Sequence, residues 1–266
     1  MNVIDMLEDM EDGYLDISNM GLKKLPNLTE FKNVIELNCS DNYFTQLPKT
    51  LSNLKYLDCS NNKLKKLGNL PKLEYLDCYN NELTKLPELP SVTKLKCRYN
   101  RLINLSELPN VISLDCSDND LIELPNLPKV QNLNCQFNQL THLPELPAVI
   151  NLNCSYNRMR NLPELPEVRS LDIKFCHLKV LPYLPNCKNL QCGGNSLHYN
   201  PKFNKLHWSI INLITLKIYV NRWRKFNCKA VSDKKQSLHN ELLYSPDLPF
   251  YKNTEEYVHW VENTRD

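Results

Sequence analysis

Cysteine thiols are the most reactive side chains that recur regularly in this sequence of 266 residues. Seven of the 11 cysteines stand at intervals of 19 or 20 residues, and an eighth, Cys192, returns to the same position after a unit that carries Ile173. The seven are Cys39, Cys59, Cys78, Cys97, Cys116, Cys135 and Cys154. Such a series could pair as disulfides, bind a metal ion, or pack as small buried hydrophobic side chains.

The spacing of the cysteines favours packing over reactivity. Side chains that repeat in adjacent strands lie about 4.8 Å apart and point in parallel directions, whereas a disulfide requires Cβ atoms about 3.8 Å apart and turned toward each other. Neither a histidine nor a second thiol accompanies the series to complete a four-ligand metal site. The sequence therefore predicts a column of buried thiols, with no metal and no cofactor. Free thiols persist best in a reducing compartment, so a cytoplasmic location is expected.

Other side chains with catalytic potential are scattered. None of the six histidines stands where a repeated fold would bring it beside a nucleophile and an acid. Five glycines are too few for a phosphate-binding loop. The formal net charge of +2 argues against a dedicated nucleic-acid binder. We therefore predict that the protein is not an enzyme and does not bind nucleic acid.

The cysteines belong to a longer repeat that must position every other side chain. Its leucines stand 19 residues apart at Leu57, Leu76, Leu95, Leu114, Leu133, Leu152, Leu171 and Leu190. An asparagine follows five residues later at Asn62, Asn81, Asn100, Asn119, Asn138, Asn157 and Asn195. Leu15 and Leu37 mark two earlier units, so ten units lie between about Tyr14 and Asn200.

Each part of the unit predicts a local structure. Strand alternation places the leucine and the cysteine inside and the residues around them outside. The asparagine falls at a turn, where its amide can bond the backbone of its own and the neighbouring coil. Met20 and Cys176 replace it in two units, and Met20 marks an atypical first coil. The returning segments, such as Leu86–Pro90, are rich in proline and are therefore expected to be extended.

The unit Val111–Leu121 resembles the leucine-rich repeat, L-x-x-L-x-L-x-x-N-x-L. Its length and its L-P-E-L-P phrase are similar to the repeats of bacterial secreted effectors that act inside host cells. Residues 222–224 and 238–252 make the chain resemble leucine-rich repeat proteins of giant DNA viruses more closely still. The resemblance implies a solenoid, a right-handed superhelix of the α/β type with a parallel sheet on its concave face and an extended convex face. For a viral protein it implies a location in the host cytoplasm.

The bacterial effectors with such repeats often carry a ubiquitin-ligase domain with a Cys-x-Asp active site. Cys39–Asp41 and Cys116–Asp118 match these letters, but both cysteines belong to the predicted buried column. Cys228 is the one cysteine beyond the repeats, and no aspartate follows it at this spacing. The segment around it is also much shorter than the ligase domain. We therefore predict no ligase activity.

The outward strand positions would build the concave face, and its middle gathers tyrosines and cations of the kind that dominate binding hot spots. The predicted partner-binding residues are Tyr56, Asp58, Tyr75, Asp77, Tyr79, Lys94, Lys96, Arg98 and Tyr99. The column of Tyr79 and Arg98 also contains serines, such as Ser60 and Ser117, which are expected to point outward. The second half of the face is mostly asparagine, serine and glutamine, which we interpret as solvated. The alternative is that the patch consists of ordinary exposed strand residues.

Both ends of a solenoid require a cap. Residues 1–13 are acidic, with apolar residues at helical spacing, and predict an N-terminal cap helix; residues 14–200 form the array. Residues 201–266 predict a helical C-terminal cap with a basic segment at 217–235. That segment contains a weak IQ-like motif at Val220–Lys225, which suggests binding to a calmodulin-like protein or to an anionic membrane surface. A solvated helix face is the alternative. No transmembrane segment and no secretory signal are expected.

We predict a monomeric, non-enzymatic scaffold that binds a protein partner on the concave face. A second hypothesis is an adaptor that recruits substrates through the repeats and an enzyme such as a ubiquitin ligase through the C-terminal helices. A third is binding to a calmodulin-like protein or to a membrane surface through the basic segment. The sequence does not identify the partner.

Overall fold

The computed structural model describes residues 3–10, 12–26 and 28–199, together with five helical residues further on. Those five are Leu213, Leu216, Lys217, Tyr219 and Val220. The chain divides into two compact units, residues 1–201 and 202–266, and the repeats lie in the first. Apart from those five residues, the predicted C-terminal cap and its basic segment lie outside the described residues. None of the described helices has the length and apolar character that crossing a membrane requires.

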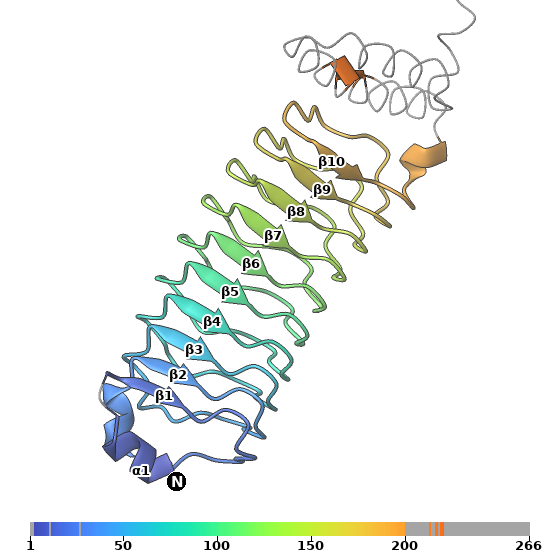
Figure 1. Ribbon diagram of the computed structural model, residues 1–266. Helices are drawn as coiled ribbons and strands as arrows, with labels where there is room; N and C mark the ends of the chain where they lie inside the picture. Colours follow the sequence, from blue (N-terminus) through green and yellow to red (C-terminus); the bar gives the residue numbers. More distant parts are fainter. Residues whose placement is uncertain are drawn as a thin grey trace, which may run out of the picture. The chain divides into compact units, whose positions relative to one another are not determined.

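The first unit is built on one ten-stranded parallel sheet, in which the strands follow chain order (Figure 1). The strands are β1 (Tyr14–Asp16), β2 (Glu36–Asn38), β3 (Tyr56–Asp58), β4 (Tyr75–Asp77), β5 (Lys94–Lys96), β6 (Ser113–Asp115), β7 (Asn132–Asn134), β8 (Asn151–Asn153), β9 (Ser170–Asp172) and β10 (Asn189–Gln191). Their register aligns the central leucines, for example Leu57 with Leu76. The parallel solenoid predicted from the leucine period is therefore confirmed.

Little regular helix accompanies these strands. The structure assigns the 3-10 helix η1 (Thr29–Asn33) before β2 and η2 (Ser196–Tyr199) after β10. Segments such as Leu86–Pro90, which return between strands β4 and β5, are assigned neither helix nor strand. Proline explains this, because it fixes φ and removes the N–H that a helix would use. The convex side is therefore extended, as the sequence predicts.

The core consists of inward columns that run the length of the array. The strand leucines of β1 to β9 and the seven regularly spaced cysteines are buried, and each of those cysteines is 0% exposed. Leu190 of β10, the last strand, is half-buried. The column of buried thiols predicted from the spacing is therefore confirmed. Burial raises the pKa of these thiols, and that of Cys116 lies well above its usual value.

We expect these buried cysteines to resist Ellman's reagent in the native protein. The reactive species is the thiolate, and burial makes the thiolate of a residue such as Cys97 scarce. Cys187, which is half-buried, should react much faster, and Cys187→Ser should lower the fast fraction by one thiol without changing the slow one. Thiol counts with and without concentrated guanidinium chloride measure the difference. Rapid modification of the whole column in native protein would contradict the burial.

The repeated asparagine, present in eight of the ten units, closes the turn after the strand. Asn119 Nδ2 donates to the carbonyl oxygens of Cys97, Cys116 and Ser117 at 3.0, 3.2 and 3.0 Å. Its Oδ1 accepts the backbone N–H of Leu102 at 3.0 Å. Equivalent contacts are made by Asn42, Asn62, Asn81, Asn100, Asn138, Asn157 and Asn195. The predicted role of the asparagines is confirmed.

The N-terminal helix is shorter than the predicted segment 1–13. Helix α1 spans Val3–Glu8 and buries Val3 and Leu7. Gly13 adopts a left-handed φ of 72° directly before β1, which is incompatible with continuing the helix. The apolar residues at helical spacing therefore predicted the helix but not its end.

Candidate protein-interaction surface

Strands β3, β4 and β5 bring the predicted partner-binding residues together. The parallel register places Tyr56 beside Tyr75 and Tyr75 beside Lys94. At the position after the strand leucine, the register places Asp77 between Asp58 and Lys96. Tyr79, Arg98 and Tyr99 follow directly after β4 and β5. We call these nine residues the tyrosine–lysine patch.

Two tyrosines form the centre of the patch. The rings of Tyr56 and Tyr75 are stacked, with centroids 4.3 Å apart and planes 5° from parallel. The Nζ atoms of Lys94 and Lys96 lie 5.4 and 5.7 Å from the Tyr75 ring centroid, within cation–π range. Burial, followed by the neighbouring Tyr75 and Asp58, raises the pKa of Tyr56 to about 12. Tyr56 therefore remains a neutral hydrogen-bond donor at physiological pH.

An ion pair between Lys96 and Asp77 lies next to the Tyr75 ring. Lys96 Nζ lies 2.8 Å from Asp77 Oδ2. The carboxylate is largely buried and also accepts the backbone N–H of Tyr79 through Oδ1 at 3.1 Å. The hydrogen bond to Asp77 raises the pKa of Lys96, so the ammonium group stays charged. Because Lys96 is paired, Lys94 is the cation of the pair that is more available to a partner.

Arg98 and two further tyrosines extend the patch toward the turn. Arg98 Nε lies 3.0 Å from Asp118 Oδ2, and its guanidinium carbon lies 4.6 Å from the centroid of Tyr99. The rings of Tyr79 and Tyr99 meet edge to face with centroids 5.7 Å apart. The patch therefore contains two groups of side chains that already contact one another, one around Tyr75 and one around Tyr99.

The serines of the Tyr79 and Arg98 column do not point outward as predicted. Ser60 and Ser117 are buried, and the hydroxyl of each donates to the aspartate two residues earlier, Asp58 or Asp115, at 2.6 Å. The strict alternation of a strand does not apply to them, because each strand ends at that aspartate and the chain then turns. The serines help to hold the turn and are not part of the exposed face.

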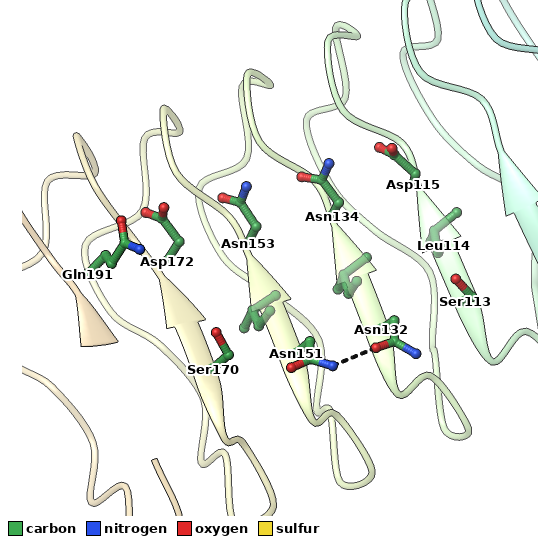
Figure 2. A pocket seen from close by; sticks show the side chains of 12 residues that line it. Ser113, Leu114, Asp115, Asn132, Asn134, Asn151, Asn153, Ser170, Asp172 and Gln191 are labelled. Atoms are coloured by element: carbon green, nitrogen blue, oxygen red, sulfur yellow. Dashed lines mark hydrogen bonds between the residues drawn. The ribbon is translucent and has the colours of Figure 1, made fainter. Parts of the chain in front are cut away.

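A second feature of the concave face was not recognised in the sequence. A hollow of about 430 Å³ lies over β6 to β10. It is lined by Ser113, Leu114, Asp115, Asn132, Leu133, Asn134, Asn151, Leu152, Asn153, Ser170, Asp172 and Gln191 (Figure 2). Asn151 Nδ2 donates to Asn132 Oδ1 at 2.7 Å, and Asn153 Nδ2 donates to Gln136 Oε1 at 2.8 Å. The sequence feature that could have indicated this hollow is the pair of asparagines on each of two successive strands. Their short amide side chains leave the hollow open.

The described residues contain no group of three or more histidine, cysteine, aspartate or glutamate side chains that could hold a metal ion. The concave face instead offers aromatic rings, cations and amides. Such groups bind a partner by contact area and hydrogen bonding, and they are not arranged as a nucleophile with its base.

Comparison with known proteins agrees with this fold. Residues 52–91 match the family described as "Leucine Rich repeats (2 copies)". Among solved structures, YopM, a leucine-rich effector protein from Yersinia pestis, is 30% identical over 73% of this chain and 63% of that chain, with a TM-score of 0.62. A leucine-rich repeat protein of Leptospira interrogans is 25% identical over 66% of this chain and 59% of that chain, with a TM-score of 0.51. No curated protein matches the sequence.

A more distant comparison shows the fold alone. The glycosylated Toll–Spatzle complex of Drosophila contains a chain that is 23% identical over 68% of this chain and 32% of that chain, with a TM-score of 0.59. This chain thus spans less than two thirds of the length of each of these three structures.

The parallel sheet, the buried leucines and the asparagine at eight of the ten turns define the class, a solenoid of the leucine-rich repeat fold. The family match over residues 52–91 and the similarity to YopM agree with this fold. The resemblance to proteins of giant DNA viruses and the cytoplasmic location stay predictions.

Proposed function

We propose that this protein is a non-enzymatic interaction scaffold that binds a protein partner through the tyrosine–lysine patch. The observation that carries the proposal is the ordered contact among Tyr56, Tyr75, Lys94 and Lys96 on adjacent strands. The leucine-rich repeat fold supports it, because such repeats generally serve as interaction surfaces. A solenoid offers one long face for this purpose.

The physical advantage of the patch is that it is preorganised. Immobilising a flexible side chain on binding costs about 0.5–1.5 kcal/mol. Here stacking and the ion pair between Lys96 and Asp77 already restrict the side chains in the free protein. Tyrosine rings add large contact areas that lose few rotamers. A partner that combines an apolar or aromatic group with a carboxylate would use both the rings and the Lys94 ammonium group.

The proposal is tested with a partner identified by affinity purification of the full chain. Tyr75→Ala, Lys96→Ala and Arg98→Ala combined should weaken its binding by at least about 2 kcal/mol, roughly 30-fold. Isothermal titration calorimetry measures the change, and circular dichroism verifies that the fold is intact.

The matched control removes the same side-chain types elsewhere. Tyr183, Lys129 and Arg169 are exposed and lie outside the strands. Their combined replacement by alanine should leave the affinity unchanged. If the patch variant binds as tightly as this control, the partner uses another surface and the assignment of the patch is wrong.

The other two hypotheses depend on the C-terminal segment. The adaptor hypothesis requires helices within residues 201–266, and the calmodulin-like or membrane hypothesis requires the basic segment 217–235. Apart from the five helical residues, both lie outside the described residues. The scaffold is therefore the function that we propose. A monomeric state also stays a prediction.

A further inference from the structure

In each unit, the residue just before the position of the repeated asparagine has a left-handed backbone. Its φ lies between 51° and 55° in nine successive units and is 71° at Gly194 in the tenth. The ten residues are Asn19, Asp41, Asn61, Asn80, Tyr99, Asp118, Phe137, Tyr156, Phe175 and Gly194. Glycine, asparagine and aspartate adopt this conformation most readily, and bulky residues rarely do. The turn itself therefore favours the residues found in six units and disfavours the aromatic residues found in four.

Three of these aromatic residues stack into a ladder. The ring centroids of Phe137 and Tyr156 are 4.3 Å apart, and those of Tyr156 and Phe175 are 4.7 Å apart. The planes deviate from parallel by 12° and 22°. The column then ends on Gly194, where a Cβ atom would lie 2.4 Å from Cδ1 of Phe175. The faces of the Phe175 ring are therefore covered by Tyr156 on one side and by Gly194 on the other.

The aromatic ladder remains exposed in spite of this stacking. Phe137, Tyr156 and Phe175 are 45, 41 and 51% exposed. Both faces of Tyr156 are covered by rings, and those of Phe175 are covered by Tyr156 and Gly194, so solvent reaches these two rings at their edges. Phe137 is covered by Tyr156 on one face. The edge of an aromatic ring carries partial positive charge, so it attracts carboxylate oxygens as well as apolar groups.

Basic residues follow the ladder residues closely in the sequence, and we call them the basic margin. Arg158 and Arg160 follow Tyr156 by two and four residues, and Lys179 follows Phe175 by four; all three are exposed. Among the residues that the structure describes, none of these cations forms a salt bridge, whereas nearby Lys174 is neutralised by Asp172 at 3.3 Å. Unpaired cations beside positive ring edges favour a negatively charged partner.

We propose that the aromatic ladder and its basic margin form a second docking surface, which binds an extended acidic peptide segment with apolar side chains. The strip is one ring wide and crosses three coils, which suits a single extended chain. The apolar side chains would pack on the ring edges, and the carboxylates would pair with Arg158, Arg160 and Lys179. Single-stranded nucleic acid is disfavoured, because its bases bind by stacking on free ring faces, and Tyr156 and Phe175 have none.

Binding of synthetic probes to the full chain tests the chemistry, with fluorescence anisotropy as the measurement. The probes are a labelled peptide that alternates glutamate with leucine and phenylalanine, the same peptide with lysine for glutamate, the same peptide with serine for the apolar residues, and oligothymidine. The acidic, apolar peptide should bind at least about tenfold more tightly than the other three. Equal or tighter binding of any other probe would overturn the proposal.

Substitution by asparagine, the residue that this turn accepts at Asn61 and Asn80, separates binding from folding. Phe137→Asn, Tyr156→Asn and Phe175→Asn combined should weaken peptide binding at least about tenfold and leave Tm unchanged or higher. Tyr183→Asn, at an exposed tyrosine outside the ladder, is the control and should change neither.

A charge reversal keeps the test decisive if the triple variant unfolds. Arg158→Glu with Arg160→Glu leaves the rings in place and should also weaken binding at least about tenfold. Unchanged binding in this variant would show that the aromatic ladder only stabilises the solenoid and is not the docking surface. Peptide binding should not respond to the alanine substitutions in the tyrosine–lysine patch, so the two proposals fail separately.

Discussion

Asn119→Ala is expected to lower the free energy of unfolding of the array by about 3 kcal/mol or more. The substitution removes the donor from three backbone carbonyls, including that of Cys97 in the preceding coil, and the acceptor from the Leu102 N–H. Asn119 is largely buried, so water does not readily replace these partners. An unsatisfied buried polar group costs about 1–3 kcal/mol. Chemical denaturation followed by circular dichroism measures the loss.

Two further variants provide comparisons in the same experiment. Asn110 makes two side-chain hydrogen bonds, with Pro90 and Lys129, and makes them at the surface. Asn110→Ala should therefore cost less than about 1 kcal/mol. Asn119→Cys should fall between the two, since Cys176 Sγ at the equivalent position keeps two contacts, 3.2 and 3.8 Å from the carbonyl oxygens of Cys154 and Lys174. Equal losses of unfolding free energy for Asn110→Ala and Asn119→Ala would show that the buried turn contributes no more to stability than the exposed hydrogen bonds do.

The features that could be predicted from the sequence are those that every coil shares. Leu57 and Leu76 align because the same inward position recurs after each turn of the chain. Cys116 and Asn119 are buried for the same reason. A correct interpretation of one unit therefore predicts the core positions of the other units. The tyrosine–lysine patch could be predicted as a neighbourhood, since the register alone brings Tyr75 beside Lys94. Its ion pair and ring stacking depend on rotamers that no spacing encodes.

The features that could not be predicted depend on where each short strand ends. Ser60 follows the alternation of a strand in the sequence, but β3 ends at Asp58 and the serine turns inward to bond that carboxylate. The hollow over β6 to β10 depends on the shape of a polar surface, and composition shows only that the surface is polar. The sequence indicates no role for Phe137 and Phe175, because their positive φ values, in a turn that disfavours aromatic residues, are visible only in the structure.

Gly194→Ala is expected to lower the free energy of unfolding by about 3 kcal/mol. Two costs combine: a left-handed φ of 71°, which costs a non-glycine residue about 1–2 kcal/mol, and overpacking, which costs about 1–3 kcal/mol. The new methyl group would lie between 2.4 and 2.9 Å from three atoms of the Phe175 ring. The ring must therefore move, which would disturb its stacking on Tyr156.

Gly21→Ala is the matched control for this substitution. Gly21 has a similar φ of 67°, but no atom lies within 4 Å of the position of its added Cβ. It should therefore show only the backbone cost, about 1–2 kcal/mol. Combining Gly194→Ala with Phe175→Asn should remove the steric part and reveal a coupling energy of about 1–2 kcal/mol in a double-mutant cycle. If Gly194→Ala lowers the free energy of unfolding no more than Gly21→Ala does, or if the cycle shows no coupling, then the aromatic ladder does not end in contact with Gly194. One face of the Phe175 ring would then be open to base stacking.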